Sequence, residues 1–494
     1  GIGTYVRATS ETDAQVGDRA NDPVRVTAKD VRAKAAGEGG NLGWTQAGRI
    51  EYARNGGRIN TDFIDNSAGV DTSDHEVNIK ILLDAEVAAG RISEQERDKL
   101  LPAMADDVAS LVLRHNHSQN LALANALSSD GPTAGVLEAW MCELEESGHL
   151  DRAVDTMPST TEMNRRMAAG ERLASPELCT LLAWTKIALC DAVLATDLPE
   201  DPFVADRLVG YFPPLLRERF TERMPTHRLH REIITTEAVN RFVDSQGITA
   251  YYRLHLQTGA DIAQVIRCQL AARSVFGLGR VETDLTHLGL DAVRTAKIRL
   301  ALTDLAMHTT RWFLNHGGAD DIAGTIETYR PGVATLVEKL SERLLGDSAD
   351  AWQEKVDEVT ELGLDRSDAA VVAAYDWSPV LLSIVEISEE GHPLDEVADA
   401  YLTLARRVDM IRLTRLVEQL PQDRPTDARV RASLREDLLR VMSDATRRAL
   451  VIGTDNVLAD GGRIVKSIAA NPDLAHCVVM VSDLRSAVGQ EVTL

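Results

Sequence analysis

Residues 37–76 read GEGGNLGWTQAGRIEYARNGGRINTDFIDNSAGVDTSDHE. Glycines and short polar side chains crowd two segments of this stretch, residues 37–43 and 66–73, and a helical pattern over residues 45–54 lies between them. Glycine has no Cβ, so a glycine-rich backbone lets main-chain amides approach a ligand closely, and asparagine adds both a donor and an acceptor. The stretch therefore predicts two loops that close over one ligand.

The first glycine cluster also imitates a dinucleotide-binding fingerprint. Gly37, Gly39 and Gly43 have similar spacing, and Asp62 follows where the fingerprint's acidic residue is expected. The spacing is one residue too long, however, and the helix that follows is weak and polar, whereas a true fingerprint joins an apolar strand to an apolar helix start. From the residues alone, a glycine-rich turn without a ligand stays open as the plainer interpretation.

The motifs of this stretch carry a family resemblance. In order along the chain they read GEGGNLG, TQ, GRIEYA, GGRINTD, DNSAGVD and SDHEVNIKILL, preceded by GIGTYV and GDRAND near the start. This pattern resembles the late part of the catalytic region of the large NAD-dependent glutamate dehydrogenases of bacteria. The small glutamate dehydrogenases carry weaker relatives of the same two loops. Residues 150–280 resemble the C-terminal helical region of the large enzymes more loosely, and the remainder does so by helical character.

The resemblance implies NAD as cofactor and the oxidation of L-glutamate to 2-oxoglutarate and ammonia. It implies that Gly39, Gly40 and Asn41 lie beside the nicotinamide ribose and that Asn66 holds the nicotinamide carboxamide near the substrate amine. Val70 and Ser73, with Asn66, are then expected to contact the substrate, Ser73 at its distal carboxylate. The family's catalytic lysines and aspartate precede the segment that starts at Gly1. The resemblance therefore implies no catalytic acid or base here and no activity for this portion alone.

Ser73 also has a purely structural interpretation. Ser73 and Glu76, followed by apolar residues, have the spacing of a capping box at the start of a helix. A serine at a helix N-terminus can also present amides and the helix dipole to an anion, so both interpretations can hold together.

The predicted fold is mostly α. Residues 1–73 are expected to form the C-terminal part of an α/β Rossmann-like NAD-binding domain, with strands over residues 1–6, 24–26 and 31–35. Residues 74–127 are expected to be helices that return to the substrate domain, and residues 128–494 an all-helical domain after the linker 128–135. Apolar residues three and four apart predict helices over residues 77–89, from 93 onward, 108–126, 136–146, 175–196, 201–209, 227–246, 261–276, 288–315, 334–345 and 394–420.

The composition argues against nucleic acid and membranes as binding partners. The 494 residues carry a formal net charge of -23, which repels nucleic acid and anionic membranes. Five cysteines, odd in number and without CxxC spacing, indicate reduced thiols in a cytoplasm. No stretch approaches eighteen uncharged apolar residues, so no membrane span is expected.

No metal site is expected either. His115 and His117 are two residues apart, so in a helix their side chains diverge and cannot hold one ion. His227 and His230 share a helical face but lack a third ligand there, which favours a solvated helix start.

A second hypothesis is a helical assembly and regulatory module without activity of its own. The start at Gly1, without methionine, suggests a portion of a longer chain, whose upstream domains would be partners. The family resemblance also implies a homo-oligomer, a tetramer or hexamer, and in some members a forkhead-associated-domain regulator.

Overall fold

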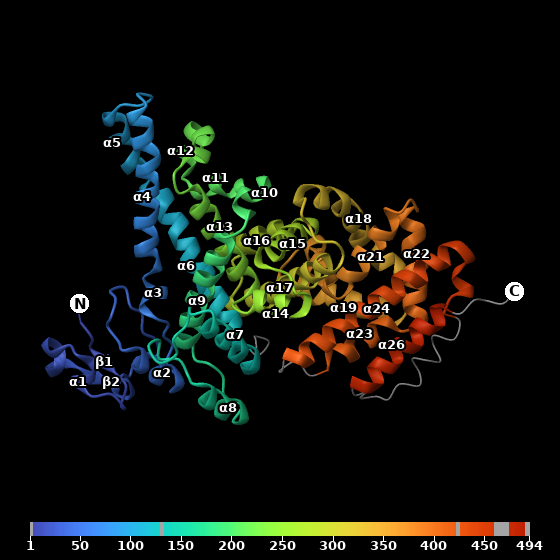
Figure 1. Cartoon of the computed structure of the whole chain (residues 1–494), viewed down its shortest axis with the longest axis horizontal. Helices are drawn as coiled ribbons and strands as arrows, with labels where there is room; N and C mark the ends of the chain where they lie inside the picture. The colour runs from blue at the N-terminus through green and yellow to red at the C-terminus, as the bar shows by residue number, and fades with distance from the viewer. Residues whose placement is uncertain (1–2, 129–132, 421–424, 459–473, 490–494) are drawn as a thin grey trace. The chain divides into compact units, whose positions relative to one another are not determined.

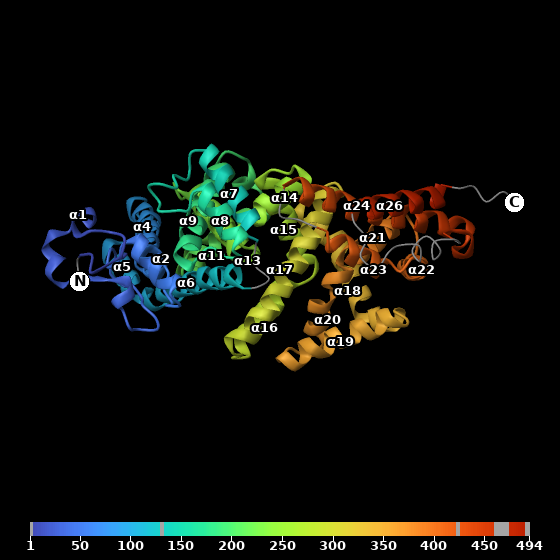
Figure 2. The same cartoon turned by 90° about the horizontal axis from the view of Figure 1, so that it is seen from below.

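The computed structural model describes residues 3–128, 133–420, 425–458 and 474–489. The chain divides into two compact units, Gly1–Ala250 and Tyr251–Leu494, and nearly all of its regular structure is helical. Figures 1 and 2 show the helices of each unit in two perpendicular views.

The first unit opens with a small mixed segment. Two short parallel strands, β1 (Val6–Arg7) and β2 (Val26–Thr27), pair with Val6 opposite Val26. Val6 packs with Ala28, Tyr52 and Ile59 in a small apolar cluster that joins the strands to helix α2 (Gln46–Arg54). The first two predicted strands each overlap an observed strand by one residue, Val6 and Val26, and residues 1 and 2 lie outside the described part.

The third predicted strand, residues 31–35, is wrong. Within residues 31–35 only Ala35 forms a bridge, to Arg58, and this pairing does not extend into a ladder. Among the described residues the sheet has two strands, so the Rossmann-like character of this part stays a prediction.

Helices make up the rest of the first unit. Two long ones, α4 (Ser67–Ala88) and α6 (Ala105–Leu127), pack side by side (Figure 1). The others are α1 (Asp13–Val16), α3 (Asp62–Asp65), α5 (Glu94–Ala103), α7 (Ala134–Glu146), α8 (Thr160–Ala168), α9 (Ser175–Leu194), α10 (Pro202–Ala205), α11 (Arg207–Tyr211), α12 (Pro214–Phe220) and α13 (His230–Gln246). The centre of the predicted linker, residues 129–132, lies outside the described residues.

The prediction of a second loop over residues 66–73 is wrong. This segment is already helical, because α4 begins at Ser67 and Ser73 lies well inside it. Ser73 therefore caps nothing, and its hydroxyl donates to the carbonyl of Val70 at 2.6 Å. Ser67 and Gly69 are weaker helix formers than Ala68, so local propensity alone favours a turn here, and packing of α4 against α6 outweighs it.

The second unit is a helical assembly around apolar residues such as Trp312, Phe313 and Tyr401. In both views α24 (Pro425–Ile452) and α26 (Leu474–Gly489) lie side by side (Figures 1 and 2). Helix α14 (Ala250–Thr258) begins at the last residue of the first unit. The others are α15 (Ile262–Val275), α16 (Leu278–His287), α17 (Ala292–Asn315), α18 (Ile322–Arg343), α19 (Asp347–Leu362), α20 (Arg366–Ala373), α21 (Ser378–Ser388), α22 (Leu394–Arg407) and α23 (Met410–Glu418).

One continuous helical run, Arg366–Ser388, is long and apolar enough to cross a membrane by length and composition. Asp376 interrupts its apolar sequence, and 67% of its most apolar window is buried inside the protein, as in a core helix. The cysteines, all within the described residues, are Cys142, Cys179, Cys190, Cys268 and Cys477, and each is a free thiol.

Candidate functional site

A buried ion pair joins the glycine-rich loop, residues 37–43, to helix α2. Arg49 of α2 donates to both oxygens of the Glu38 carboxylate, at 2.6 Å from Nε and 2.9 Å from Nη2. Asp62 lies 3.2 Å from the same guanidinium. Burial alone would lower the pKa of Arg49, but the hydrogen bonds and charge of Glu38, with Asp62, outweigh it and raise that pKa. Arg49 is therefore charged and links the loop residue Glu38 to Asp62 of α3.

Carboxylates from the start of α3 and from its end also fix the loop backbone. The amide of Leu42 donates to Asp62 at 2.9 Å, and the amide of Glu38 donates to Asp65 at 2.9 Å. Leu42 adopts a left-handed conformation with φ of 68°. Asp62 thus anchors the loop. Its contacts with Leu42 and Arg49 give it a structural role, and it need not be the acidic residue of a dinucleotide-binding fingerprint. The loop tip, Gly39 to Asn41, is left exposed.

The two predicted ligand-binding segments meet through their asparagines. The Asn66 side-chain amide donates to the side-chain oxygen of Asn41 at 3.1 Å, across 25 positions of sequence. Asn66 is the residue that precedes α4, so the contact joins the loop tip to the start of that helix. A Cβ added at Gly39 would meet no atom within 4 Å, so the loop leaves open space beside its backbone.

Two of the three predicted substrate residues, Val70 and Ser73, lie on the exposed side of α4. Val70 is 66% exposed, and Ser73 is exposed as well. Leu42, beside Asn41 in the loop, is 65% exposed. Val70 and Leu42 are large apolar side chains exposed to solvent, and exposed apolar surface of this kind is available to a ligand or to another part of a protein.

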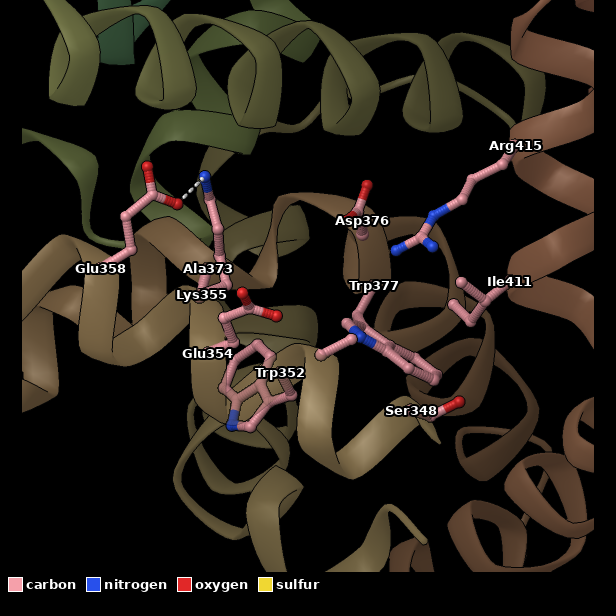
Figure 3. A pocket seen from close by; sticks show the side chains of 11 residues that line it. Ser348, Trp352, Glu354, Lys355, Glu358, Ala373, Asp376, Trp377, Ile411 and Arg415 are labelled. Carbon is pink, nitrogen blue, oxygen red and sulfur yellow. Dashed lines mark hydrogen bonds and ion pairs between the residues drawn. The ribbon is translucent and has the colours of Figure 1, made fainter. Parts of the chain in front are cut away.

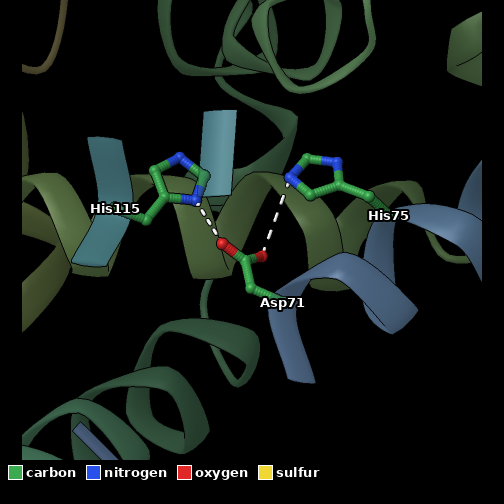
Figure 4. A group of neighbouring side chains, drawn as sticks. All are labelled: Asp71, His75 and His115. Atoms are coloured by element: carbon green, nitrogen blue, oxygen red, sulfur yellow. Dashed lines mark hydrogen bonds and ion pairs between the residues drawn. The ribbon is translucent and has the colours of Figure 1, made fainter. Parts of the chain in front are cut away.

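A cluster of titratable groups occupies the other side of the same turn of α4. Figure 4 shows the Asp71 carboxylate between the imidazole rings of His75 and His115. Asp71 Oδ2 lies 2.7 Å from His115 Nδ1, and Asp71 Oδ1 lies 3.6 Å from His75 Nε2. One potential ligand atom from each residue lies within 4.8 Å of the others. The donor set, two imidazoles and one carboxylate, is one that divalent metals use.

Aromatic and polar neighbours hold His75 in position. Its ring stacks on Tyr211 with 4.2 Å between centroids. Tyr211 donates from its hydroxyl to Asp74 at 2.7 Å and accepts from Asn78 at 2.9 Å. The polar partners of this layer thus belong to Tyr211, and His75 makes only ring contacts with it.

His227 is not part of a solvated helix start, so that prediction is wrong. It is 3% exposed, and its Nε2 donates to the backbone carbonyl of Asn78 at 3.0 Å. Its Nδ1 accepts from the amide of Leu229, so both nitrogens serve structure. Helix α13 begins three residues later, at His230.

The two histidines beside Asp71 differ in basicity. Burial lowers the pKa of His75, and the charge of Asp71 opposes this only partly. Burial would also lower the pKa of His115, but its hydrogen bond to Asp71 and the charge of Glu237 outweigh burial and raise that pKa. Of the two histidines, His115 therefore holds a proton more firmly than His75 does.

Sequence reasoning missed this cluster. Asp71 and His75 are four apart and share a helical face, which is a local signal of joint action. His115 arrives from α6, and only the packing of the two helices brings it to Asp71. His117 is exposed on α6, so the two histidines of that motif do not act together.

The second unit contains a pocket of its own, of about 320 Å³. Figure 3 shows two indole rings, Trp352 and Trp377, with Asp376 and Arg415 on its wall. Lys355, also in the wall, pairs with Glu358 at 2.9 Å. Burial raises the pKa of Asp376. None of the predicted site residues belongs to this pocket.

Comparison with known proteins identifies two segments of the chain. Residues 1–126 match the family model described as bacterial NAD-glutamate dehydrogenase, catalytic domain, and residues 170–491 match the model described as glutamate dehydrogenase, C-terminal.

Relatives with curated names agree. The chain is 39% identical to the NAD-specific glutamate dehydrogenase of Mycobacterium tuberculosis, over 92% of this chain and 28% of that protein. It is 37% identical to the protein of the same name from Pseudomonas aeruginosa, over 100% of this chain and 31% of that protein. The chain thus spans about three tenths of the length of these relatives. Because one family model alone covers well over half of the residues, the chain belongs to the bacterial NAD-dependent glutamate dehydrogenase family.

Proposed function

We propose that this chain supplies the cofactor- and substrate-contacting surface of an NAD-dependent glutamate dehydrogenase. The observation that carries the proposal is the hydrogen bond between Asn41 and Asn66, which brings the glycine-rich loop and the start of α4 together at an exposed surface. Gly39, Gly40, Asn41 and Asn66 contact NAD in this proposal, and Asn66, Val70 and Ser73 contact glutamate. When bound, NAD accepts the hydride from the substrate Cα.

The loop fits the nicotinamide end of a dinucleotide. Space for a ligand lies beside Gly39, and the Asn41 and Asn66 amides offer both donors and acceptors to ribose hydroxyls and a carboxamide. The ion pair of Glu38 and Arg49 and the amide hydrogen bonds of Glu38 and Leu42 to Asp65 and Asp62 restrain the loop. A prearranged loop of this kind contributes to catalysis by positioning, because less ordering is needed when the ligand arrives.

Ser73 acts on the distal carboxylate of glutamate. Its hydroxyl donates to the carbonyl of Val70 in the chain as it stands. Binding then requires the hydroxyl to turn outward and donate a hydrogen bond to the carboxylate, and the exposure of Ser73 leaves room for this. A hydrogen bond to a charged group is worth about 1.5–3 kcal/mol, roughly 10- to 100-fold in binding.

Steady-state kinetics of Ser73→Ala in the full-length enzyme test this assignment. We expect the KM for glutamate to rise about tenfold or more, while the KM for NAD changes little. Thr72→Ala, at the neighbouring exposed position of the same helix, is the control and should leave both constants unchanged. Equal increases in the two KM values for Ser73→Ala would refute the substrate role.

Proton transfer is left to other parts of the enzyme in this proposal. The family resemblance assigns the catalytic lysines, the aspartate and the pyrophosphate fingerprint to segments that precede Gly1, so no catalytic residue is assigned here. The strands β1 and β2 would then complete an α/β domain together with those segments. Residues 1–494 alone should show no glutamate-dependent reduction of NAD, and turnover by them would contradict this part of the proposal.

Assembly is a further part of the proposal. We expect a cytoplasmic homo-oligomer, a tetramer or hexamer, in which the helical region takes part in subunit contacts. Light scattering on the full-length protein measures this directly, and a monomeric mass at micromolar concentration would contradict it.

A further inference from the structure

We propose that Asp71, His75 and His115 form a binding site for one divalent zinc ion, which ties the start of α4 to α6. The three side chains converge from two helices, with Asp71 and His75 one turn apart on α4 and His115 on α6 (Figure 4). This site is separate from the exposed residues to which the proposed dehydrogenase function is assigned.

The strongest observation is the state of His75. Its ring is 0% exposed, and the described part of the chain offers neither of its nitrogens a hydrogen-bond partner. A buried polar atom without a partner costs free energy and calls for an explanation such as a bound ion. His75 Nε2 faces Asp71 from 3.6 Å, a separation beyond hydrogen-bond distance but open to an ion between them.

A proton alone does not explain the cluster. The proton shared by Asp71 and His115 serves those two residues at 2.7 Å and leaves His75 without a partner. A divalent ion in the same place can take one carboxylate oxygen, His115 Nδ1 and His75 Nε2 together. Replacing the proton by an ion thus uses all three groups.

The dimensions and chemistry suit zinc. Zinc binds imidazole and carboxylate at about 2.0–2.2 Å in a tetrahedral arrangement, so its ligand atoms lie about 3.3 Å apart. The ligand atoms here lie within 4.8 Å, and small side-chain rotations can close the set. Asp71 and His115 are each about one quarter exposed, which leaves water access to the fourth position.

The surroundings also support an ion. His115 presents its other nitrogen, Nε2, to Glu237 at 3.9 Å. In zinc sites a carboxylate on that side of a ligating histidine typically accepts a hydrogen bond from the ring, and at 3.9 Å the Glu237 charge acts on the ring electrostatically. Asp74 adds a further negative charge near His75, while Arg114 opposes it. The carboxylates outnumber the one cation named here, so a divalent cation is electrostatically favoured.

The test is calorimetric titration of zinc chloride into tag-free, full-length protein from which metal has been removed with a chelator. We expect one zinc ion per chain for the wild type and for His117→Gln, which changes an exposed histidine on the same helix. Asp71→Asn and His115→Gln should each weaken binding at least about tenfold, with unchanged circular dichroism spectra.

Two outcomes would overturn the proposal. One is a wild-type protein that binds no zinc at a one-to-one ratio. The other is equal binding by Asp71→Asn, His115→Gln and His117→Gln, which would locate the ion elsewhere. A measurement that needs no variant supports these titrations, because cobalt(II) bound by this ligand set in the wild type should show the visible absorption of a tetrahedral ion. An octahedral cobalt spectrum would also contradict the site.

Discussion

Two buried charges of opposite sign, Glu38 and Arg49, support the loop that we assign to NAD. Their side chains are 4% and 6% exposed. Breaking such a pair by removing one partner is expensive, because the other charge stays buried without compensation. Asp62 at 3.2 Å supplies only part of that compensation.

The variant Glu38→Gln should therefore lower the stability of the protein by about 3 kcal/mol. The measurement is the midpoint of thermal unfolding followed by circular dichroism. Glu76→Gln is the matched control, since Glu76 pairs with Lys80 on the surface of α4 and should leave the midpoint unchanged. A Glu38→Gln midpoint equal to that of wild type would contradict the role of the buried pair.

The variant Gly39→Ala, which adds one methyl group, tests whether NAD approaches the backbone at residue 39. A Cβ there meets nothing, so Gly39→Ala should keep its unfolding midpoint. The KM for NAD of the full-length enzyme should rise roughly tenfold if a ligand uses the open space. Gly57→Ala is the contrasting variant, because its Cβ would lie 2.2 Å from the Tyr52 ring and should destabilise the protein. An unchanged KM for Gly39→Ala would argue against close approach of NAD.

His316 makes the stability of the second unit depend on pH. It lies 3.0 Å from Glu386 and 3.2 Å from Glu436, and its ring stacks on Trp312. Burial alone would lower its pKa, but the two carboxylates outweigh burial and raise the pKa to about 9. Because the folded pKa exceeds the ordinary value, this stabilisation is fully present below the unfolded pKa of about 6.5. It is lost as pH rises through about 9.

His316→Gln should thus cost about 3 kcal/mol at about pH 6 and little at about pH 10. Thermal midpoints across that range measure the difference. His287→Gln, at an exposed histidine of the same unit, should give a curve parallel to wild type. A loss that is constant with pH for His316→Gln would exclude the ion pairs as its cause.

At the scale of helices, capping patterns predicted some starts well and one badly. Ser93 caps α5, where a helix was predicted to start, and Thr45 caps α2 at the first residue of the predicted helical pattern. Ser73 has the same local pattern but lies inside α4, because a helix can pass through a capping sequence when its earlier residues also pack. Similarly, the single helix expected over residues 394–420 is two, since Asp409 has a φ of 47° between α22 and α23.

The position of Ser73 predicts a contrast in stability. Ser73→Ala removes only a bond to the carbonyl of Val70 and should change the free energy of unfolding by less than about 0.5 kcal/mol. Ser93→Ala removes a true cap, whose oxygen accepts from the amide of Glu96, and should cost about 1 kcal/mol. Denaturant unfolding of the two variants compares them directly. A larger loss for Ser73→Ala would mean that it has a structural role.

For the whole molecule, periodicity and family resemblance predicted different things. Apolar spacing was enough for a mostly helical chain, because each amphipathic helix buries one face. Resemblance pointed to the pair of segments that Asn41 and Asn66 join. Neither predicted Asp71 with His115 or His227 with Asn78, since those contacts depend on how separate helices pack. Local sequence patterns do not indicate which helices pack against each other.

The central claim is that the loop tip and the start of α4 together contact NAD. Fluorescence titration of NADH into the full-length enzyme tests it with Asn41→Ala, Asn66→Ala and the double variant, using Asn55→Ala at the exposed end of α2 as control. We predict that each single change weakens binding about tenfold and that the double change adds little, because the two side chains act as one unit. Wild-type affinity in both single variants would contradict the account.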